Sequence, residues 1–189
     1  SFLNPSIKNF LPNPDTLMDM EKSSKRAVEA IIKKQKIGIF GDYDVDGATS
    51  TALLGNYFSE LNVDYEFYIP DRKKEGYGPS IKSFQELINK KVKIIFTVDC
   101  GTLSFEAINF AKEKNVDVIV IDHHIAGPEL PKAHSVVNPN RLDEDGSFGY
   151  LCATSVVFIV IAGMLRTLRL RGYFTATHTA PDLLKHLDL

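Results

Sequence analysis

The sequence predicts an α/β fold, a mainly parallel β-sheet flanked by helices, and two observations carry the prediction. Short apolar runs rich in β-branched and aromatic residues recur along the chain, and stretches with helical spacing separate them. The 189 residues, 44% of them hydrophobic, suffice for one domain with a substantial core. We expect residues 1–35 to form an N-terminal lead and a helix packed on a domain made by residues 36–189.

Changes in hydrophobic period place the individual elements. Asp15 is expected to cap a first helix over 16–35, where apolar residues recur three and four positions apart. The expected strands are the short apolar runs 36–40, 65–70, 92–99, 116–122 and 135–139. The other expected helices are 48–61, 79–90, 103–115 and 151–171. Strands that alternate with helices imply right-handed crossovers, and therefore a mainly parallel sheet.

Composition argues against secretion and against a membrane segment. Two cysteines, Cys100 and Cys152, cannot form a disulfide framework, which favours a reducing compartment. The most apolar run, Tyr150 to Leu165, is shorter than the ~20 residues of a membrane span, so a buried helix is expected. The start of the chain has no basic region followed by an apolar one, as a signal peptide would. We therefore expect a cytoplasmic protein. We also expect it to be a monomer.

The net charge of −2 gives no global basic field that would indicate nucleic acid binding. This argument is weak, because aspartate clusters supply much of the negative charge. Bound divalent metals would cancel that charge and reverse its effect on an anionic substrate.

Acidic and imidazole groups follow three of the expected strands. Asp42, Asp44 and Asp46, within GDYDVDGATS, follow the first strand; Asp99 ends the third, and the DHH sequence at 122–124 ends the fourth. In open parallel sheets, ligands bind outside the carboxyl ends of the strands. A single aspartate after a strand is more often a helix cap. Three such clusters at one edge of a sheet indicate a functional site.

Two kinds of site fit the opening aspartates but leave other residues unused. A calcium loop of the EF-hand type needs a bidentate carboxylate where this chain has Leu53, and a helix before the loop. A phosphatase of the haloacid dehalogenase type would use Asp44 as nucleophile and Asp46 as general acid. Its threonine would then come one residue late, at Thr49, and Asp42 and the two histidines would have no role. The calcium loop is excluded, whereas the phosphatase remains an alternative.

A dinuclear metal site uses all of these residues. Carboxylates with an imidazole and no thiolate suit Mn²⁺ or Mg²⁺ better than a structural zinc. Asp99 can bridge two ions, with Asp42 and Asp44 each turned towards one of them. Two ions ~3.5 to 4 Å apart lower the pKa of a shared water and hold a phosphoryl oxygen, as phosphoester hydrolysis requires.

The motifs GDYDVDGATS, TVDCG and IDHH, in this order, resemble those of the DHH phosphoesterase superfamily. Within it, the sequence is most similar to the RecJ branch, bacterial exonucleases specific for single-stranded DNA. The resemblance covers nearly the whole chain, including FLNPS, LPNPDTLMDMEK, IPDRKKEGYGPS, VNPNR and GYLCATSVVF. It implies a two-metal exodeoxyribonuclease that degrades single strands from the 5′ end in DNA repair and recombination. A helicase and a single-strand-binding protein are the implied partners.

The resemblance also implies roles for single residues. Asp42, Asp44, Asp99 and His123 match metal ligands, with Asp99 as the bridge. His124 matches the histidine that meets the scissile phosphate or the leaving group.

Four more residues match positions around the metals. Asp46 and Asp122 are expected to orient the ligands, with helix capping as the alternative. Arg72 and Tyr77 suit contacts with a phosphate and a base, although a turn before a helix also explains their segment.

The chain departs from the family pattern at three places. Gly38 stands where DHH pyrophosphatases have a histidine, which disfavours that branch, and Thr154 and Ser155 replace a small pair. The family's fourth motif supplies an aspartate ligand shortly after a segment like Leu187 to Leu189, where this chain stops. We expect a DHH domain truncated before that motif, without the DHH-associated and OB-fold domains, and nearly inactive alone.

Two alternatives to the exonuclease stay open. One is a DHH phosphodiesterase acting on nanoRNA, phosphoadenosine phosphate or cyclic dinucleotides. The other is a non-catalytic scaffold that binds single strands.

Overall fold

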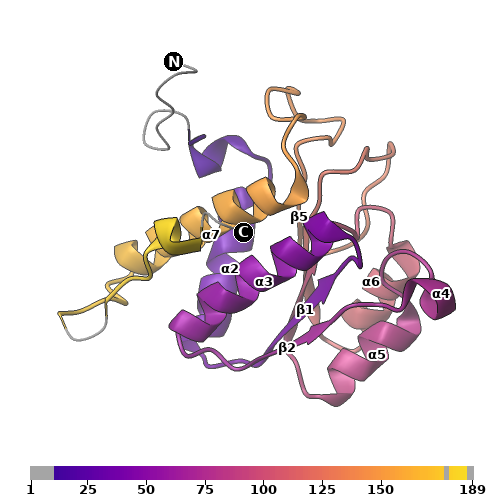
Figure 1. Cartoon of the computed structure of the whole chain (residues 1–189), viewed down its shortest axis with the longest axis horizontal. Helices are drawn as coiled ribbons and strands as arrows, with labels where there is room; N and C mark the ends of the chain where they lie inside the picture. Colours follow the sequence, from indigo (N-terminus) through magenta and orange to yellow (C-terminus); the bar gives the residue numbers. More distant parts are fainter. Residues whose placement is uncertain (1–10, 177–178, 187–189) are drawn as a thin grey trace.

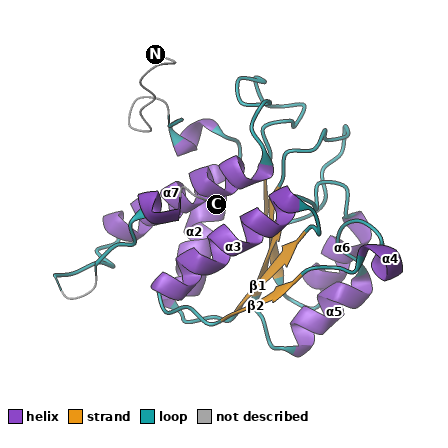
Figure 2. Ribbon diagram, viewed as in Figure 1, coloured by secondary structure: helices purple, strands orange, loops and turns teal. Residues whose placement is uncertain are grey.

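Five parallel strands form one sheet with helices on both faces (Figures 1 and 2), in a computed structural model that describes residues 11–176 and 179–186. The strand order is β2-β1-β3-β4-β5, and all four pairings are parallel. The strands are β1 (Ile37–Gly41), β2 (Tyr65–Tyr68), β3 (Ile94–Val98), β4 (Asp117–Ile121) and β5 (Ser135–Val137). The predicted fold class is confirmed, and each strand lies within one residue of its predicted run or inside it.

Helices cover the sheet in two layers. One face carries α2 (Met20–Ile32), α3 (Val45–Glu60) and α7 (Ala153–Leu170); the other carries α5 (Ile81–Asn89) and α6 (Phe105–Glu113). The short elements are η1 (Pro14–Thr16), α4 (Arg72–Glu75) and η2 (Leu183–His186). Successive strand residues point to opposite faces, so Ile94 and Phe96 belong to the first core and Ile95 to the second.

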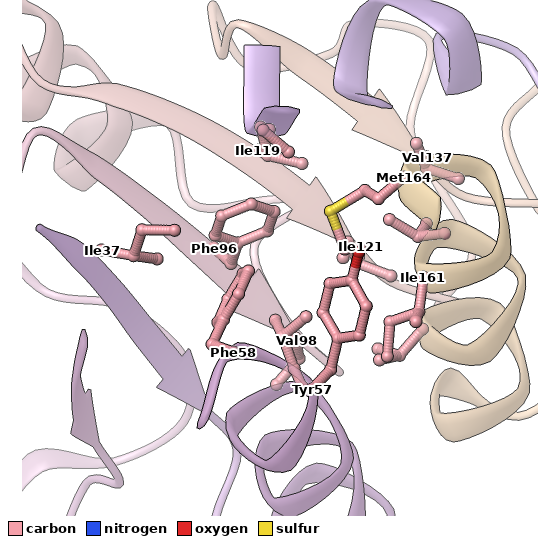
Figure 3. Close-up of a cluster of buried hydrophobic side chains, with 14 of the residues drawn as sticks. Ile37, Tyr57, Phe58, Phe96, Val98, Ile119, Ile121, Val137, Ile161 and Met164 are labelled. Atoms are coloured by element: carbon pink, nitrogen blue, oxygen red, sulfur yellow. The ribbon is translucent and has the colours of Figure 1, made fainter. Parts of the chain in front are cut away.

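Aromatic side chains tie α3 to the sheet. Figure 3 shows Tyr57 and Phe58 reaching from α3 towards the strands, with Ile161 and Met164 of α7 beside them. The rings of Phe58 and Phe96 lie 5.5 Å apart between centroids. This packing holds the long helices α3 and α7 on the same face of the sheet.

The connections reverse direction between β1 and β3. From β1 the chain runs through α3 to β2 on one side of β1; from β3 it runs through α6 to β4 on the opposite side and the opposite face. Doubly wound sheets bind their ligands at the carboxyl ends of the strands where this reversal occurs. The fold therefore marks the ends of β1 and β3, at Gly41 and Val98, as the place for a site.

The first helix begins later than predicted, and the expected cap at Asp15 is wrong. Residues 14–16 form a 3₁₀ turn whose cap is Asn13, and α2 starts only at Met20. Between them Asp19 takes a left-handed backbone conformation, with φ 59°, which interrupts the helix. The Asp19 carboxylate accepts a hydrogen bond from the backbone N–H of Val136 at 3.0 Å, so this turn fastens the lead to β5.

The remaining differences between the predicted and the observed structure concern the start of one helix and one additional short helix. Helix α3 begins at Val45, three residues before the predicted start, and α4 was not predicted. By length and composition α7 could cross a membrane, but more than half of it is buried against α2, α3 and β4, as the predicted buried helix requires. The FLNPS motif and Leu187 to Leu189 lie outside the described residues.

Candidate metal centre

Asp42 and Asp99 lie at the reversal point and are buried. Each directly follows its strand, β1 or β3, and they are 3% and 1% exposed. Among the described residues, one carboxylate oxygen of Asp42 and both of Asp99 have no hydrogen-bond partner. Buried carboxylate oxygens are strongly unfavourable without a hydrogen bond or a cation. Their chemistry therefore fits a bound metal ion.

The two carboxyl groups have perturbed acidities. Burial raises the pKa of Asp99 to about 8, and the charges of Asp46 and Asp44 act in the same direction. Burial also raises the pKa of Asp42, with a further contribution from the Asp44 carboxylate. This crowding of like charges would be relieved by a divalent cation.

Asp99 stands between two groups of potential ligands. Ligand atoms of Asp42, Asp44 and Asp99 lie within 4.8 Å of one another, and so do those of Asp99, His123 and His124. A carboxylate common to both groups has the position that a bridging ligand needs. The structure thus brings together the four residues predicted to bind metal, and their binding stays a prediction.

Asp44 is fixed at the start of α3. Its side chain accepts a hydrogen bond from the backbone N–H of Gly47 at 2.9 Å and caps the helix. A carboxylate oxygen of Asp44 also lies within 4.8 Å of ligand atoms of Asp42 and Asp99. Capping and metal binding are therefore compatible roles for Asp44.

The imidazole of His123 is oriented for metal binding. Its Nδ1 lies 3.1 Å from the backbone carbonyl oxygen of Leu151, which can only accept, so Nδ1 carries the hydrogen. In the neutral ring Nε2 then has a lone pair, and it lies 3.3 Å from a carboxylate oxygen of Asp99. Two electron-pair donors that face each other suit a shared cation, with the carbonyl fixing the ring.

Asp122 holds the other histidine. One oxygen of the buried Asp122 carboxylate lies 2.7 Å from Nδ1 of His124, and the other accepts a hydrogen bond from the N–H of Thr102 at 3.0 Å. The hydrogen bond to Asp122 raises the pKa of His124. Burial alone would raise the pKa of Asp122, but the hydrogen bonds from His124 and Thr102 outweigh it and lower the pKa. Asp122 therefore stays ionised and leaves Nε2 of His124 for a substrate.

Asp46 caps a helix, but not the one to which it belongs. Its carboxylate, at the start of α3, accepts hydrogen bonds from the N–H groups of Ala153 at 2.7 Å and Thr154 at 2.8 Å, in the first turn of α7. The Thr154 hydroxyl adds a third at 2.6 Å. Burial would raise the pKa of Asp46, but these bonds lower it. The carboxylate also lies 3.8 Å from Nε2 of His123, so it can both cap α7 and orient a ligand.

Thr154 and Ser155, which depart from the family pattern, have different neighbours. The N–H and the hydroxyl of Thr154 donate hydrogen bonds to Asp46, and the hydroxyl also lies 3.2 Å from that of Ser50. The hydroxyl of Ser155 lies 3.3 Å from the exposed thiol of Cys152. The threonine therefore adds a contact at the centre.

The structure places Tyr77 at the centre and Arg72 at its edge. The Tyr77 hydroxyl donates a hydrogen bond to the backbone carbonyl of Asp99 and lies 3.2 Å from Nδ1 of His124. Beside it is a hollow of about 570 Å³, whose lining includes Tyr77, Leu103 and His124. The Arg72 guanidinium stacks over the ring of Tyr43, 5.3 Å from its centroid. Substrate binding by either residue stays a prediction.

Sequence reasoning missed several residues that shape the centre. Tyr43, Asn138 and Asn140 belong to the motifs described above, but the sequence indicates no role for them. The Leu151 carbonyl could not be identified from residue type.

The position of Gly38, where DHH pyrophosphatases have a histidine, faces the core. At Gly38, an added Cβ would contact Ile95, in the core opposite α3. A side chain at that position of β1 would therefore point into the core that α5 and α6 cover.

Without divalent metal, the free energy of unfolding of this chain is expected to fall as the pH rises from about 4 to about 8. An unfolded Asp99 carboxyl titrates near 3.8 and the folded one near about 8, so in this range the folded chain holds a proton that the unfolded chain has released. Rising pH then favours unfolding. Urea unfolding in EDTA across this range measures the slope, which Asp99→Asn should reduce. Equal slopes for the two proteins would contradict the prediction.

Comparison with known proteins gives consistent matches. The family model described as "DHH family, N-terminal domain" matches residues 36–184. The single-stranded-DNA-specific exonuclease RecJ of Haemophilus influenzae is 38% identical over 188 residues, which cover 99% of this chain and 32% of that protein. The RecJ of Bacillus subtilis is 37% identical over 164 residues, covering 87% of this chain and 21% of that protein.

A solved structure agrees with the family model and with these two relatives. The crystal structure of exonuclease RecJ bound to manganese matches with a TM-score of 0.74 and 31% identity, covering 80% of this chain and 38% of that one. The chain spans between a fifth and a third of the curated relatives named above. The family model covers far more than half of the chain, and the parallel α/β fold agrees with the RecJ structure. This chain therefore belongs to the DHH family.

Proposed function

We propose that this chain is the catalytic part of a metal-dependent phosphodiesterase that degrades single-stranded DNA from its 5′ end. The observation that carries the proposal is Asp99, a buried carboxylate without hydrogen-bond partners among the described residues, which is common to two groups of potential ligands. The similarity to RecJ exonucleases supports single-stranded DNA as the substrate. Roles in DNA repair and recombination belong to the same proposal.

The residues at the centre fit two Mn²⁺ or Mg²⁺ ions. Asp42, Asp44, Asp99 and His123 would hold them, since carboxylate oxygens and a neutral imidazole suit these metals. When bound, such ions polarise a phosphoryl oxygen and lower the pKa of a water molecule. A RecJ crystal structure bound to manganese supports this choice of metal.

The protein's own groups would place the phosphodiester beside the ions. His124, oriented by Asp122, would direct Nε2 at the scissile phosphate or the leaving oxygen and could donate a proton there. Tyr77 lies in contact with His124 and could stack on a base, while Arg72 could bind a phosphate at the rim. The substrate would thus enter across the exposed side of His124.

The test is release of nucleotides from a 5′-phosphorylated single strand by the whole protein that contains this chain, with this chain alone beside it. We expect release that depends on Mn²⁺ from the whole protein and little from the chain alone, which spans a third or less of its curated relatives. Duplex DNA of the same sequence should be a poor substrate.

Two outcomes would contradict the proposal. Faster hydrolysis of dinucleotides, phosphoadenosine phosphate or cyclic dinucleotides than of long strands would favour the small-substrate alternative. Binding of single strands without any hydrolysis, by folded and Mn²⁺-loaded protein, would favour the scaffold. Interaction with a helicase or a single-strand-binding protein, a monomeric state and a cytoplasmic location stay predictions.

A further inference from the structure

Within the described part of the chain, the hydrogen bonds to the backbone of His123 and His124 all come from side chains. These two residues lie in neither a helix nor a strand. Both of their N–H groups donate to one carboxylate oxygen of Asp122, at 2.8 and 3.2 Å. Their carbonyl oxygens accept hydrogen bonds from Asn140 and Asn138 respectively. The conformation of the dipeptide therefore depends on three side chains, of which only Asp122 was expected.

Asn138 connects three segments at this edge of the sheet. It directly follows β5 and is fully buried. Its Nδ2 donates to the carbonyl of His124 at 2.8 Å and to the hydroxyl of Thr102 at 2.9 Å, and its Oδ1 accepts from the N–H of Asn140 at 2.8 Å. Thr102 in turn donates its N–H to Asp122. The Asn138 amide thus holds the backbone carbonyl of His124, while Asp122 holds its N–H and its imidazole.

Asn140 acts on the other histidine. Its side-chain amide donates to the carbonyl of His123 and, at 3.3 Å, to that of Gly149. Gly149 lies just before Leu151, whose carbonyl fixes the His123 ring. Asn140 therefore ties the backbone of His123 to the segment that orients its imidazole.

We propose that Asn138 and Asn140 are positioning residues for the hydrolytic reaction, with Asn140 fixing the metal-facing His123 and Asn138 fixing the substrate-facing His124. An asparagine amide provides what this role needs, a neutral donor and an acceptor on one rigid group. Neither side chain reaches the ions or the substrate in this account. The inference rests on the proposed function, because that function assigns metal binding to His123 and substrate contact to His124.

The test compares Asn138→Ala and Asn140→Ala with a matched control, Ser135→Ala. Ser135 is also buried and lies in β5, but at the end away from the centre, where its hydroxyl bonds to that of Ser23 at 2.8 Å. Asn140→Ala should weaken Mn²⁺ binding about tenfold or more, as loss of a partner behind a ligand commonly does. Asn138→Ala should lower kcat of the whole protein with little change in KM. Ser135→Ala should leave both the Mn²⁺ affinity and kcat unchanged.

Histidine side-chain NMR spectra of the metal-free chain give a readout independent of metal and activity. The Nδ1–H proton of His124, bonded to Asp122, should exchange faster with water in Asn138→Ala than in wild type or in Ser135→Ala. If wild type bound no Mn²⁺, the proposed function would fail, while this exchange rate would still decide the role of Asn138.

Wild-type exchange rates in Asn138→Ala, or wild-type Mn²⁺ affinity in Asn140→Ala, would overturn the inference. Should Asn138→Ala not fold, the isosteric Asn138→Asp removes the donor to His124 while keeping the shape of the side chain. It should show the same faster exchange, and wild-type exchange in this variant would also overturn the inference.

Discussion

Asp99→Asn is expected to abolish both Mn²⁺ binding and hydrolysis, yet to stabilise the metal-free chain. Near neutral pH the substitution removes a buried carboxyl group that holds a proton in the folded chain and releases it on unfolding, and that has no hydrogen-bond partner among the described residues. Asparagine also tolerates the left-handed backbone of this position, with φ 62°, so the chain path need not change. We expect the free energy of unfolding in EDTA to rise by about 1 kcal/mol or more near neutral pH. Thermal unfolding with EDTA and with Mn²⁺ measures both effects.

Asp122→Asn is the matched control, because Asp122 is equally buried but its carboxylate oxygens accept several hydrogen bonds. This change should destabilise the chain by about 1–3 kcal/mol, because an amide cannot accept all of them. The two variants should therefore move stability in opposite directions. A loss of stability in Asp99→Asn, or activity that survives it, would contradict the assignment of Asp99 as a metal ligand.

Gly47→Ala is expected to damage the centre, although alanine normally favours a helix by about 1 kcal/mol over glycine. Gly47 lies in the first turn of α3, and a Cβ there would lie 2.5 Å from the backbone oxygen of Asp42. Because the obstacle is backbone, the start of α3 must move away, and Asp44 and Asp46 move with it. We expect a loss of about 1–3 kcal/mol in unfolding free energy and a weaker Mn²⁺ affinity.

Gly127→Ala serves as the control for this prediction, since an added Cβ at Gly127 would have no neighbour within 4 Å. It should leave unfolding and Mn²⁺ titrations close to those of wild type. A Gly47→Ala protein as stable as wild type, with the same Mn²⁺ affinity, would contradict the prediction. It would show that Gly47 need not lie so close to the backbone of Asp42.

The sequence predicts the sheet well because β1, β3, β4 and β5 are largely buried on both faces, and the strands appear as separate apolar runs. It also brings Asp42, Asp99 and the DHH sequence to one edge, since parallel strands end on the same side. The start of α2 escaped prediction because the left-handed turn at Asp19 depends on a contact with Val136, far along the chain.

The supporting residues of the centre were harder to predict for a related reason. Asn138 and Asn140 donate hydrogen bonds to backbone carbonyl oxygens. Because every residue has such an oxygen, the sequence does not indicate which residue accepts the hydrogen bond. Asp46 could be predicted to cap a helix, but only the packing of α3 beside α7 shows that the helix is α7. Residue types can thus indicate the ligands, whereas the groups that orient them depend on tertiary contacts.

The reversal point between β1 and β3 also bears on how the chain folds. Asp42 and Asp99 become neighbours only when β1 pairs with β3, and α3, β2 and α5 lie between those strands in the sequence. Pairing over such a separation is slow, because the loop must close before its contacts form. The crowding of these carboxyl groups therefore arises only when this long-range pairing has formed. A cation that binds the assembled centre would then act mainly by slowing unfolding, and would do little to speed the early steps.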